Sequence, residues 1–349
     1  LAWSPQFDLF ERELLVRNEF CCASVNLLRA ASEFVHSQLS FVDRNAYSLP
    51  EIQRFMATYP EVLRRLADAF ESKFHPDGPS MDFGNAIQEV REEIANINSG
   101  MAEKDAKVKV VLFSVTDFIC SILKSNYYSE KKTALAFGLD PAFMRHYESI
   151  SESYGKAFPP ERPFGVFFFW RRNVSGFQIR FSEIARGGWR TVAPKPVKSL
   201  LESGDSFEQA RSELFRECFV LANTQHKKNK DIYEGGSKLV TLLKVNGEYD
   251  FKTELWAAQR AVFEAFLQLI NYGADGKLRD GKIVDFTHRA DIIEIGPDEN
   301  MTDEMISWMG DRAEEDGYTL GSGVISGKMD TGINHKHYGV TSFGVFQYL

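Results

Sequence analysis

The spacing of apolar residues changes near Pro159-Pro160, and this change constrains the possible fold more than any other feature of the sequence. From residue 6 to about 146, apolar residues recur at intervals of three and four, which is the repeat of an amphipathic helix. Few glycines interrupt this half of the chain. We therefore expect a mainly helical amino-terminal region over residues 1–160 and a second domain of different architecture over residues 161–349.

The second region alternates between strand-like and helix-like segments. Residues 164–170 and 177–181 are rich in aromatic side chains, and Asn173-Val-Ser-Gly176 between them is typical of a turn. Alternation of strands and helices favours an α/β fold, here with a mostly parallel sheet whose loops carry the functional site. The later elements that we expect are a helix over 206–223, a strand over 238–245, a helix over 254–271, a strand over 292–295 and a helix over 302–315.

The composition argues against several classes of partner. With 44% hydrophobic residues over 349 positions, the chain can bury a sizeable core. A formal net charge of -8 and a pI near 5.5 argue against a general nucleic-acid or anionic-membrane surface. Positive charge gathers at Lys227, Lys228 and Lys230, which favours a small anion as partner. The longest apolar run, residues 108–123, is interrupted by charges and is too short to cross a bilayer, so we expect no membrane segment.

The cysteines and histidines predict no metal centre. The four cysteines show neither a metal-binding spacing nor a disulfide framework, and we interpret them as reduced thiols of an intracellular protein. His335 and His337 flank Lys336, whose positive charge would repel a cation. We therefore expect no bound metal.

Two glycine-containing turns supply the best candidates for chemistry. Glu234-Gly-Gly-Ser-Lys238 sets a lysine behind two residues without side chains, so that a small substrate can approach the amine closely. Farther along, Gly296-Pro-Asp298 places an acid in a similar tight turn. An amine and a carboxylate in one cleft favour proton transfer, and partial burial would bring the pKa of the lysine toward the useful range. Asp298 could instead cap the helix expected from Thr302, although capping alone does not explain a Gly-Pro entry that exposes the acid.

Two glycine clusters fall short of nucleotide-binding motifs. Gly321-Ser-Gly323 with Gly327 matches a dinucleotide fingerprint only loosely, because the third glycine comes one position late and no acidic residue follows at the required distance. Gly235-Gly-Ser-Lys238 lacks the first glycine of a phosphate loop and the Ser or Thr after its lysine. We therefore expect no Rossmann coenzyme domain within these residues.

Five motifs stand out in the second region: Ile184-Ala-Arg-Gly-Gly-Trp-Arg190, Lys228-Asn-Lys-Asp-Ile-Tyr-Glu-Gly-Gly-Ser-Lys238, Gly296-Pro-Asp-Glu-Asn-Met-Thr-Asp303, Ser326-Gly-Lys328 and His335-Lys-His-Tyr-Gly-Val-Thr-Ser342. In kind and order they resemble the large NAD-specific glutamate dehydrogenases, and most of all the fungal-type and related eukaryotic enzymes. The resemblance covers about residues 160–349. The active-site lysine pattern of the wider glutamate, leucine, phenylalanine and valine dehydrogenase superfamily is satisfied by Ile232 through Val240, although Leu239 stands where the small enzymes usually carry glycine.

The resemblance implies a catalytic pair. Lys238 matches the family's catalytic lysine, which is expected to activate the water that attacks the 2-iminoglutarate carbon and to stabilise the charge developing there. Asp298 matches the acid that exchanges protons with the amino group of the substrate. A neighbouring positive charge should lower the pKa of this acid and keep it ionised.

The resemblance also implies residues that bind the substrate. Lys228 falls where the family places a lysine for the substrate α-carboxylate. Arg186 falls where the small enzymes have a lysine directed at the side-chain carboxylate. Arginine can hold a carboxylate in a fork, which suits a dicarboxylate such as glutamate and not leucine or phenylalanine. Further positions implied are Gly187 and Gly188 beside Arg186, Arg190 as a support of that loop, and Thr341 near the substrate or the nicotinamide edge.

The reaction implied by the resemblance is oxidative deamination of L-glutamate with NAD, which gives 2-oxoglutarate and ammonia and serves amino acid catabolism. In the superfamily a Rossmann coenzyme domain follows the matching segment, so we expect that domain after residue 349 and expect this chain, as a fragment, to be inactive alone. The alternatives are a related amino acid dehydrogenase with another substrate and a non-catalytic assembly fragment. A homo-oligomer, a mitochondrial or cytoplasmic location, and a role of the helical region in assembly or regulation are further expectations.

Overall fold

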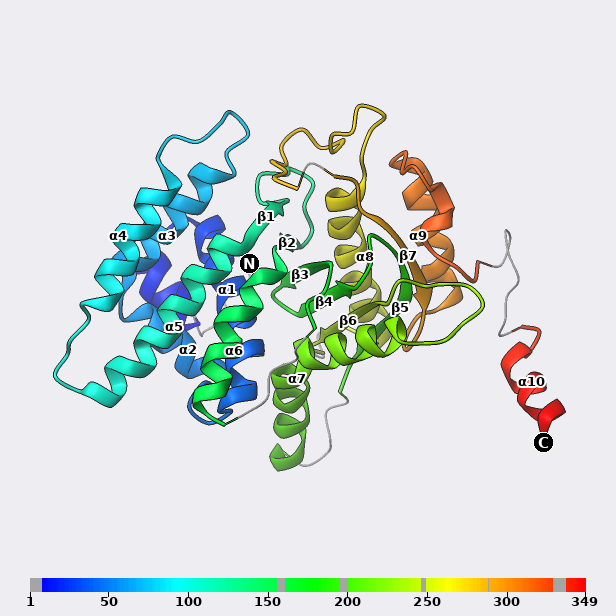
Figure 1. Cartoon of the computed structure of the whole chain (residues 1–349), viewed down its shortest axis with the longest axis horizontal. Coiled ribbons are helices and arrows are strands. Elements are labelled where there is room, and N and C mark those ends of the chain that lie inside the picture. The colour runs from blue at the N-terminus through cyan, green and yellow to red at the C-terminus, as the bar shows by residue number, and fades with distance from the viewer. Residues whose placement is uncertain (1–7, 156–160, 195–199, 246–248, 288, 329–336) are drawn as a thin grey trace.

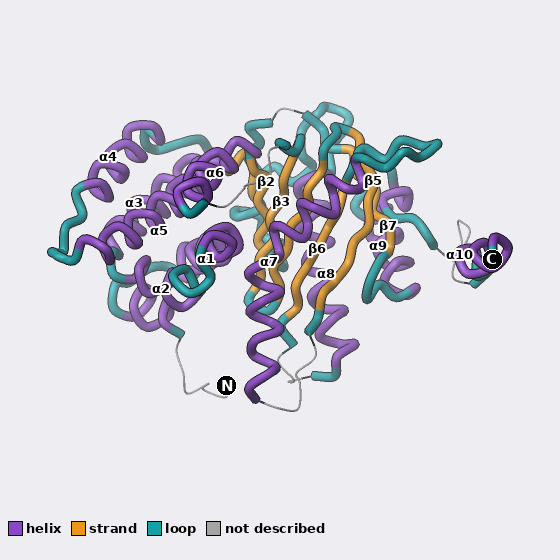
Figure 2. Tube along the Cα trace, turned by 60° about the horizontal axis from the view of Figure 1, so that its bottom comes forward, coloured by secondary structure: helices purple, strands orange, loops and turns teal. Residues whose placement is uncertain are grey.

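A mixed sheet with helices on both faces forms the body of the structure (Figure 1). The amino-terminal helices pack on one side of this sheet, and later helices cover the opposite face (Figure 2). This arrangement confirms the predicted α/β class with a helical amino-terminal region. The computed structural model describes residues 8–155, 161–194, 200–245, 249–287, 289–328 and 337–349, with the side chains of residues 200–205 excepted.

The amino-terminal region is mainly helical because its apolar residues recur with the helical repeat. Pro50 and Pro60 lie in the first turns of two of its helices, where the missing N–H of proline leaves no hydrogen bond unmade. Asp82 caps another helix by accepting a hydrogen bond from the backbone N–H of Asn85. The helices here are η1 (Glu11–Val16), α1 (Cys22–Val42), α2 (Leu49–Ala57), α3 (Pro60–Lys73), α4 (Phe83–Ala95), α5 (Ala102–Ser121), η2 (Pro141–Phe143) and α6 (Met144–Ser153).

Aromatic contacts join this helical region to the sheet. The ring of Phe34 in α1 lies 4.6 Å from that of Phe118 in α5, measured between centroids. The same ring lies 5.5 Å from Phe168 and 5.9 Å from Phe177, which are both residues of the sheet. Helix α1 therefore packs between the outer helices and the sheet.

The sheet has seven strands in the order β1-β2-β3-β4-β6-β5-β7 within the described residues. The pairs β1–β2, β2–β3, β3–β4 and β4–β6 are antiparallel, whereas β5–β6 and β5–β7 are parallel. The sheet is therefore mixed, and the expectation of a mostly parallel sheet is corrected. The strands are β1 (Ile122–Ser125), β2 (Leu135–Leu139), β3 (Gly165–Arg171), β4 (Val174–Arg180), β5 (Ile184–Val192), β6 (Ser237–Leu243) and β7 (Ile292–Pro297).

The lengths of the connections explain this mixture of directions. The turn at Arg172 and Asn173 joins β3 to β4 directly, and so short a link can join only antiparallel strands. Long connections that contain helices lead from β5 to β6 and from β6 to β7, which allows these strands to run in parallel.

Two of the strands, β1 and β2, lie inside the segment expected to be helical. The apolar run of α5 continues into β1 at Ile122, so the local pattern does not mark the change from helix to strand. Strand β2 is held by pairing with β3, as between Phe137 and Phe168, which is a contact that local spacing does not reveal. The sheet therefore begins before residue 160, and the division of the chain at that residue stays a proposal.

Both faces of β3 are apolar because both are covered. Phe168 and Trp170 belong to the core beneath the amino-terminal helices, whereas Phe167 and Phe169 belong to the core on the opposite face. Side chains alternate between the two faces of a strand, so a strand covered on both sides requires a continuous apolar run. The phenylalanine-rich segment is therefore core.

The later helices confirm the predicted elements at nearly the expected residues. Helix α7 contributes to the core shared with α1, and α8 and α9 build the core on the other face. Helix α10 has no buried residue and lies apart from the sheet in both views (Figures 1 and 2). None of the helices in the described ranges is long and apolar enough to cross a membrane. The bounds are α7 (Leu200–His226), α8 (Phe251–Ile270), α9 (Asp303–Glu315), η3 (Gly321–Val324) and α10 (Val340–Tyr348).

Candidate active site

Three parallel strands bring the predicted lysine and acid together. Lys238 is the second residue of β6, and Asp298 follows the last residue of β7. Strand β5 lies between them, and its Trp189 pairs with Leu239 of β6 on one side and with Pro297 of β7 on the other. Lys238 and Asp298 therefore flank the middle of β5 at the same level of the sheet.

The two side chains are in direct contact. The Lys238 ammonium donates a hydrogen bond to Oδ2 of Asp298, while Oδ1 accepts one from the backbone N–H of Glu299 at 2.9 Å. The backbone N–H of Asp298 donates to the carbonyl oxygen of Trp189 at 3.1 Å, which holds the turn against β5. The Lys238 side chain is 14% exposed and that of Asp298 is 43% exposed, so a small molecule can reach the pair from solvent.

Asp298 does not cap the helix that follows it. Helix α9 has Thr302 as its N-cap, whose hydroxyl oxygen accepts a hydrogen bond from the backbone N–H of Met305 at 3.3 Å. The carboxylate of Asp298 is thereby left to Lys238. The competing interpretation of this acid as a helix cap is excluded by this contact.

The glycines of β5 make room for the pair. A Cβ atom at Gly188 would lie 2.9 Å from Nζ of Lys238 and 3.0 Å from Oδ2 of Asp298, so the end of at least one of these side chains would have to shift. A Cβ atom at Gly187 would lie 1.7 Å from the backbone oxygen of Ser237. Any larger residue at these positions would push β5 away from β6 or separate the lysine from the acid. The Gly-Gly sequence is therefore a geometric requirement of this site.

The pKa of Asp298 is lowered from its ordinary value. Burial alone would raise this pKa, because it disfavours the charged form, but the hydrogen bond and the charge of Lys238 outweigh it. The backbone N–H of Glu299 and the charge of Arg190 act in the same direction as Lys238. The acid therefore stays ionised beside the lysine, in the direction that the sequence predicted.

Arg186 lies on the open face of β5, close to the pair. Residues of this strand are alternately buried and partly exposed, so that Arg186, Gly188 and Arg190 lie on the partly exposed face. The Arg186 side chain is 43% exposed and lies 3.5 Å from Glu294 and 3.8 Å from Glu234. Neither distance is that of a short hydrogen bond, so the guanidinium keeps donors for a ligand.

Arg190 is already engaged by two carboxylates. Its guanidinium donates to Glu217 of α7 at 2.7 Å and to Glu299 at 3.1 Å through Nε. It therefore joins α7 to the turn that carries Asp298, and the supporting role expected for it stays a prediction. The sequence analysis missed Glu217 and Glu299, and only the position of Glu299 directly after Asp298 could have indicated one of them.

The three clustered lysines have different surroundings. Lys227 pairs with Glu161 at 2.5 Å, and Lys230 pairs with Glu234 at the same distance. Lys228 is exposed at the end of α7, and its side chain has no ion-pair partner in the described part of the chain. Of the three, Lys228 is thus the one whose charge is available to an anion. The structure records no contact that joins it to Lys238.

The remaining predicted positions are not brought to this site. Thr341 lies on the exposed helix α10, and the structure records no contact between it and Lys238 or Asp298. His335 and Lys336 lie outside the described residues, and no group of three possible metal-binding side chains occurs in the parts that are described. Gly321 to Gly323 form the short helix η3 after α9, which is not the strand-to-helix turn of a dinucleotide fingerprint.

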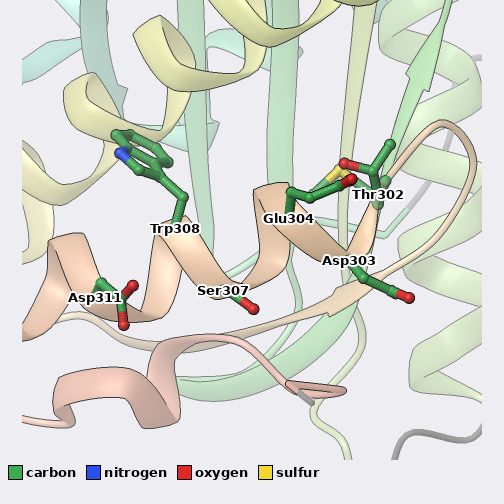
Figure 3. Close-up of a pocket in the computed structure, with 7 residues that line it drawn as sticks. Thr302, Asp303, Glu304, Ser307, Trp308 and Asp311 are labelled. Atoms are coloured by element: carbon green, nitrogen blue, oxygen red, sulfur yellow. The ribbon is translucent and has the colours of Figure 1, made fainter. Parts of the chain in front are cut away.

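The hollow drawn in Figure 3 lies along α9 and does not contain the lysine–acid pair. It has a volume of about 810 Å³ and is open to solvent. Its charged lining residues are Asp303, Glu304 and Asp311, which are all acidic. Such a lining would repel an anionic substrate, so this hollow is not a candidate for the substrate site.

Sequence comparison finds related proteins, although no family model matches the chain. The chain is 32% identical over 315 residues to "Glutamate dehydrogenase 2" of Dictyostelium discoideum, across 88% of this chain and 27% of that protein. It is 32% identical over 252 residues to the "NAD-specific glutamate dehydrogenase" of Saccharomyces cerevisiae, across 70% of this chain and 20% of that protein. The protein of the same name from Neurospora crassa is 29% identical over 307 residues, across 85% of this chain and 27% of its own length. The chain thus spans about a quarter of these relatives.

Structure comparison finds only distant similarity. A hetero-hexameric glutamate dehydrogenase from Thermus thermophilus matches 47% of this chain and 30% of its own chain, with 18% sequence identity and a TM-score of 0.26. A TM-score this low carries no argument about the fold. The sequence relatives, in contrast, match across most of this chain and confirm the resemblance seen in the motifs.

Proposed function

We propose that this chain, which is homologous to a segment of the NAD-specific glutamate dehydrogenases, forms the substrate site of an enzyme that oxidises L-glutamate to 2-oxoglutarate and ammonia. The observation that carries the proposal is the contact of Lys238 with Asp298 across a glycine of β5. An amine and an ionised acid that are both reachable from solvent can exchange protons with a small bound substrate.

Lys238 would act at the α-carbon of the substrate, which is the carbon that loses the hydride. Only one acceptor, Asp298, contacts its ammonium within the described residues, and an ammonium can donate three hydrogen bonds. The remaining donors can therefore stabilise negative charge on the substrate, and the neutral amine can accept a proton from an attacking water. Hydrolysis of the iminium intermediate needs this proton transfer.

Asp298 would exchange protons with the amino group of the substrate. Its carboxylate is kept ionised by Lys238, so it can accept a proton when the amine arrives in its ammonium form. The hydrogen bond from Glu299 fixes Oδ1, which leaves Oδ2 as the oxygen shared between Lys238 and the substrate. Lys238 would thus act at the α-carbon of the substrate, and Asp298 would act at its nitrogen.

The two carboxylates of glutamate would be held by the flanking cations. Arg186 lies on the same partly exposed face of β5 as Gly188, beside the pair, and is proposed to bind the side-chain carboxylate. Lys228 has no ion-pair partner among the described residues and is proposed to bind the α-carboxylate. The positive charge of Arg186 disfavours the alternative of an enzyme for leucine or phenylalanine, whose apolar side chains would cover this charge without offering it an acceptor.

NAD is the proposed coenzyme because the related enzymes are NAD-specific by name. When bound, it would accept the hydride that leaves the α-carbon. The described residues of this chain contain no strand-to-helix glycine turn that fits a dinucleotide, so no residue is assigned to the coenzyme here. A Rossmann domain beyond residue 349, a homo-oligomeric and intracellular enzyme, and an assembly or regulatory role of residues 1–160 remain proposals drawn from the resemblance.

Calorimetric titration of the chain tests this substrate assignment. We expect glutamate and 2-oxoglutarate to bind and leucine not to bind. Arg186→Met should abolish the preference for dicarboxylates, whereas Arg145→Met, which replaces an exposed arginine of α6, should leave it intact. The absence of dicarboxylate binding by the folded chain, or equal binding by the Arg186 variant, would contradict the proposal.

A further inference from the structure

A second cavity lies toward the opposite end of the strands from the lysine–acid pair. It has a volume of about 410 Å³ and is bounded by α1, by the loop between β1 and β2, and by the end of β3. Its apolar walls include Tyr127 and Leu135, which are both buried. A cavity of this volume is at the small end of the range that holds organic ligands.

The charged residues that line this cavity are all cations. They are Lys132, Arg171 and Arg172, and no carboxylate is among the lining residues. Lys132 donates to the backbone oxygen of Ser129 at 2.9 Å, and Arg171 donates to the backbone oxygen of Ala257 at 3.1 Å. Neither has an ion-pair partner within 4.0 Å in the described ranges, although the charge of Asp280 acts on Lys132 from farther away.

Of the three, Arg172 is the one that forms ion pairs with acids among the described residues. It contacts Glu11 and lies 4.0 Å from Asp8, and its side chain is well exposed. Its remaining donors are therefore available to a ligand at the mouth of the cavity. Partial burial lowers the pKa of Lys132, which means that the protein disfavours this charge and that an anion beside it would relieve the cost.

The ring of Trp170 forms part of the apolar wall of the same cavity. Trp170 is 7% exposed, and its indole Nε1 is buried without a hydrogen-bond partner. Buried N–H groups are almost always paired, because an unpaired one costs free energy on folding. Protein atoms cover this nitrogen, so Trp170 contributes its ring to the wall and no donor to a ligand.

The position of the cavity separates it from the proposed substrate site. Trp170 pairs with Ser175 of β4, which pairs in turn with Leu242 of β6. Leu242 lies four residues from Lys238 along β6, which corresponds to about 13 Å in an extended strand. Trp170 is displaced further by two strands across the sheet. One ligand cannot fill both sites.

We propose that this cavity binds a small phosphate monoester that carries an apolar or aromatic group. Lys132, Arg171 and Arg172 would hold the phosphate, because arginine and lysine pair well with its multiple oxygens. The apolar walls, with Trp170 among them, would cover the organic group. Since α1 forms one wall, the bound ligand would join the helical region to the sheet. The proposal does not depend on the glutamate assignment.

Binding of phenyl phosphate, measured by calorimetry on this chain, tests the proposal, with inorganic phosphate and phenol as partial ligands. We expect saturable binding of phenyl phosphate that is tighter than binding of either partial ligand. Lys132→Gln should weaken it about tenfold or more, the loss of one charge-assisted hydrogen bond. Lys131→Gln is the matched control, because this neighbouring lysine does not line the cavity, and it should leave the affinity unchanged.

Arg171→Gln tests a second cation separately. It removes the charge but keeps a polar side chain, and should weaken phenyl phosphate binding about tenfold while leaving the fold intact by circular dichroism. Three results would overturn the proposal: no binding of phenyl phosphate, equal affinity for inorganic phosphate, or an equal loss in the Lys131 and Lys132 variants. The second would indicate an inorganic anion site and the third a diffuse electrostatic attraction.

Discussion

The sheet contains two lysine–aspartate pairs in opposite surroundings. Lys124 and Asp291 are almost fully buried, with 1% and 5% of their side chains exposed, whereas Lys238 and Asp298 are 14% and 43% exposed. The Lys124 ammonium donates to the carbonyl oxygen of Leu269, to the hydroxyl of Tyr272 and to Asp291, at 2.7, 2.9 and 2.5 Å. All three of its donors are thus used.

The second acid oxygen of the buried pair is occupied as well. Arg180, with 1% of its side chain exposed, contacts Oδ1 of Asp291, so two buried cations share one carboxylate. Burial would raise the pKa of Asp291, but these two charges outweigh it and lower the pKa. The group joins β1, β4 and the segment before β7, which is a structural role.

The same two types of side chain thus have a structural role in the buried pair and a proposed chemical role in the exposed pair. A pair whose hydrogen-bonding capacity is fully used inside the protein cannot act on a substrate. The Lys238 pair keeps unused donors and solvent access, and a glycine supplies the space around it.

Lys238→Ala in the full-length enzyme should have the largest effect on turnover. We expect kcat to fall by about 10²–10⁴-fold, which is the usual contribution of a positioned acid–base group. The unfolding midpoint in urea should change little, because ion pairs with this much exposure contribute little stability. Turnover of glutamate with NAD, measured beside urea unfolding, checks both expectations. A wild-type kcat in this variant would contradict the catalytic role assigned to Lys238.

Asp291→Ala should have the largest effect on stability. Its removal leaves the Lys124 and Arg180 charges buried without an acid, and loss of one partner of a buried pair costs about 3–5 kcal/mol. Urea unfolding of the chain measures this loss. Asp298→Ala serves as the control and should cost less than about 1 kcal/mol. If the free energy of unfolding fell equally in the two variants, burial would not be what distinguishes the two pairs.

Gly188→Ala should separate the exposed pair without removing either member. The added Cβ would contact both Nζ of Lys238 and Oδ2 of Asp298, so one of them must move. A displacement of this kind can reduce kcat by about 100-fold. Gly281→Ala is the matched control, since nothing lies within 4 Å of the atom added there. Comparable kcat values in both variants would argue against the proposed geometry.

Arg186→Met should change which substrate is preferred. The loss of one charged contact to the side-chain carboxylate should lower kcat/KM for glutamate by about 10- to 100-fold relative to 2-aminobutyrate. The comparison of the two substrates in one assay controls for a general loss of activity. An unchanged ratio would mean that another group reads the side chain.

The smallest effect concerns the pKa of Asp298. Lys238→Met removes the strongest influence that lowers this pKa and leaves burial, which raises it, so the pKa should rise. Because the native pKa is depressed, the pair's stabilising effect is present above the ordinary value of 3.8 and is lost as pH falls through the native pKa. Side-chain carboxyl NMR during a pH titration measures the shift. The same pKa in both proteins would mean that Lys238 does not control the acid.

Much of the fold could be predicted from the sequence because local periodicity reports local structure. The helices before residue 122 and the later strands and helices were anticipated, with α8 predicted at 254–271 and found at Phe251–Ile270. Strands β1 and β2 and their antiparallel pairing could not be predicted, because it depends on residues distant in the sequence.

The candidate site was predictable to a similar extent. Lys238 and Asp298 were found because each lies in a glycine-containing turn, and the structure brings them into contact. The acids that hold Arg190 were missed, since Glu217 lies on a different element, α7. The buried group was missed for the same reason, because Lys124 and Arg180 are separated from Asp291 by 167 and 111 positions.

The most direct test compares Asp298→Asn with Asp291→Asn in the full-length enzyme, with kcat and urea unfolding measured on each. Both changes remove a negative charge and keep the shape of the side chain. We predict that Asp298→Asn loses most of its kcat at nearly wild-type stability, whereas Asp291→Asn loses stability while its folded fraction keeps kcat near the wild-type value. Wild-type kcat in Asp298→Asn would contradict the account.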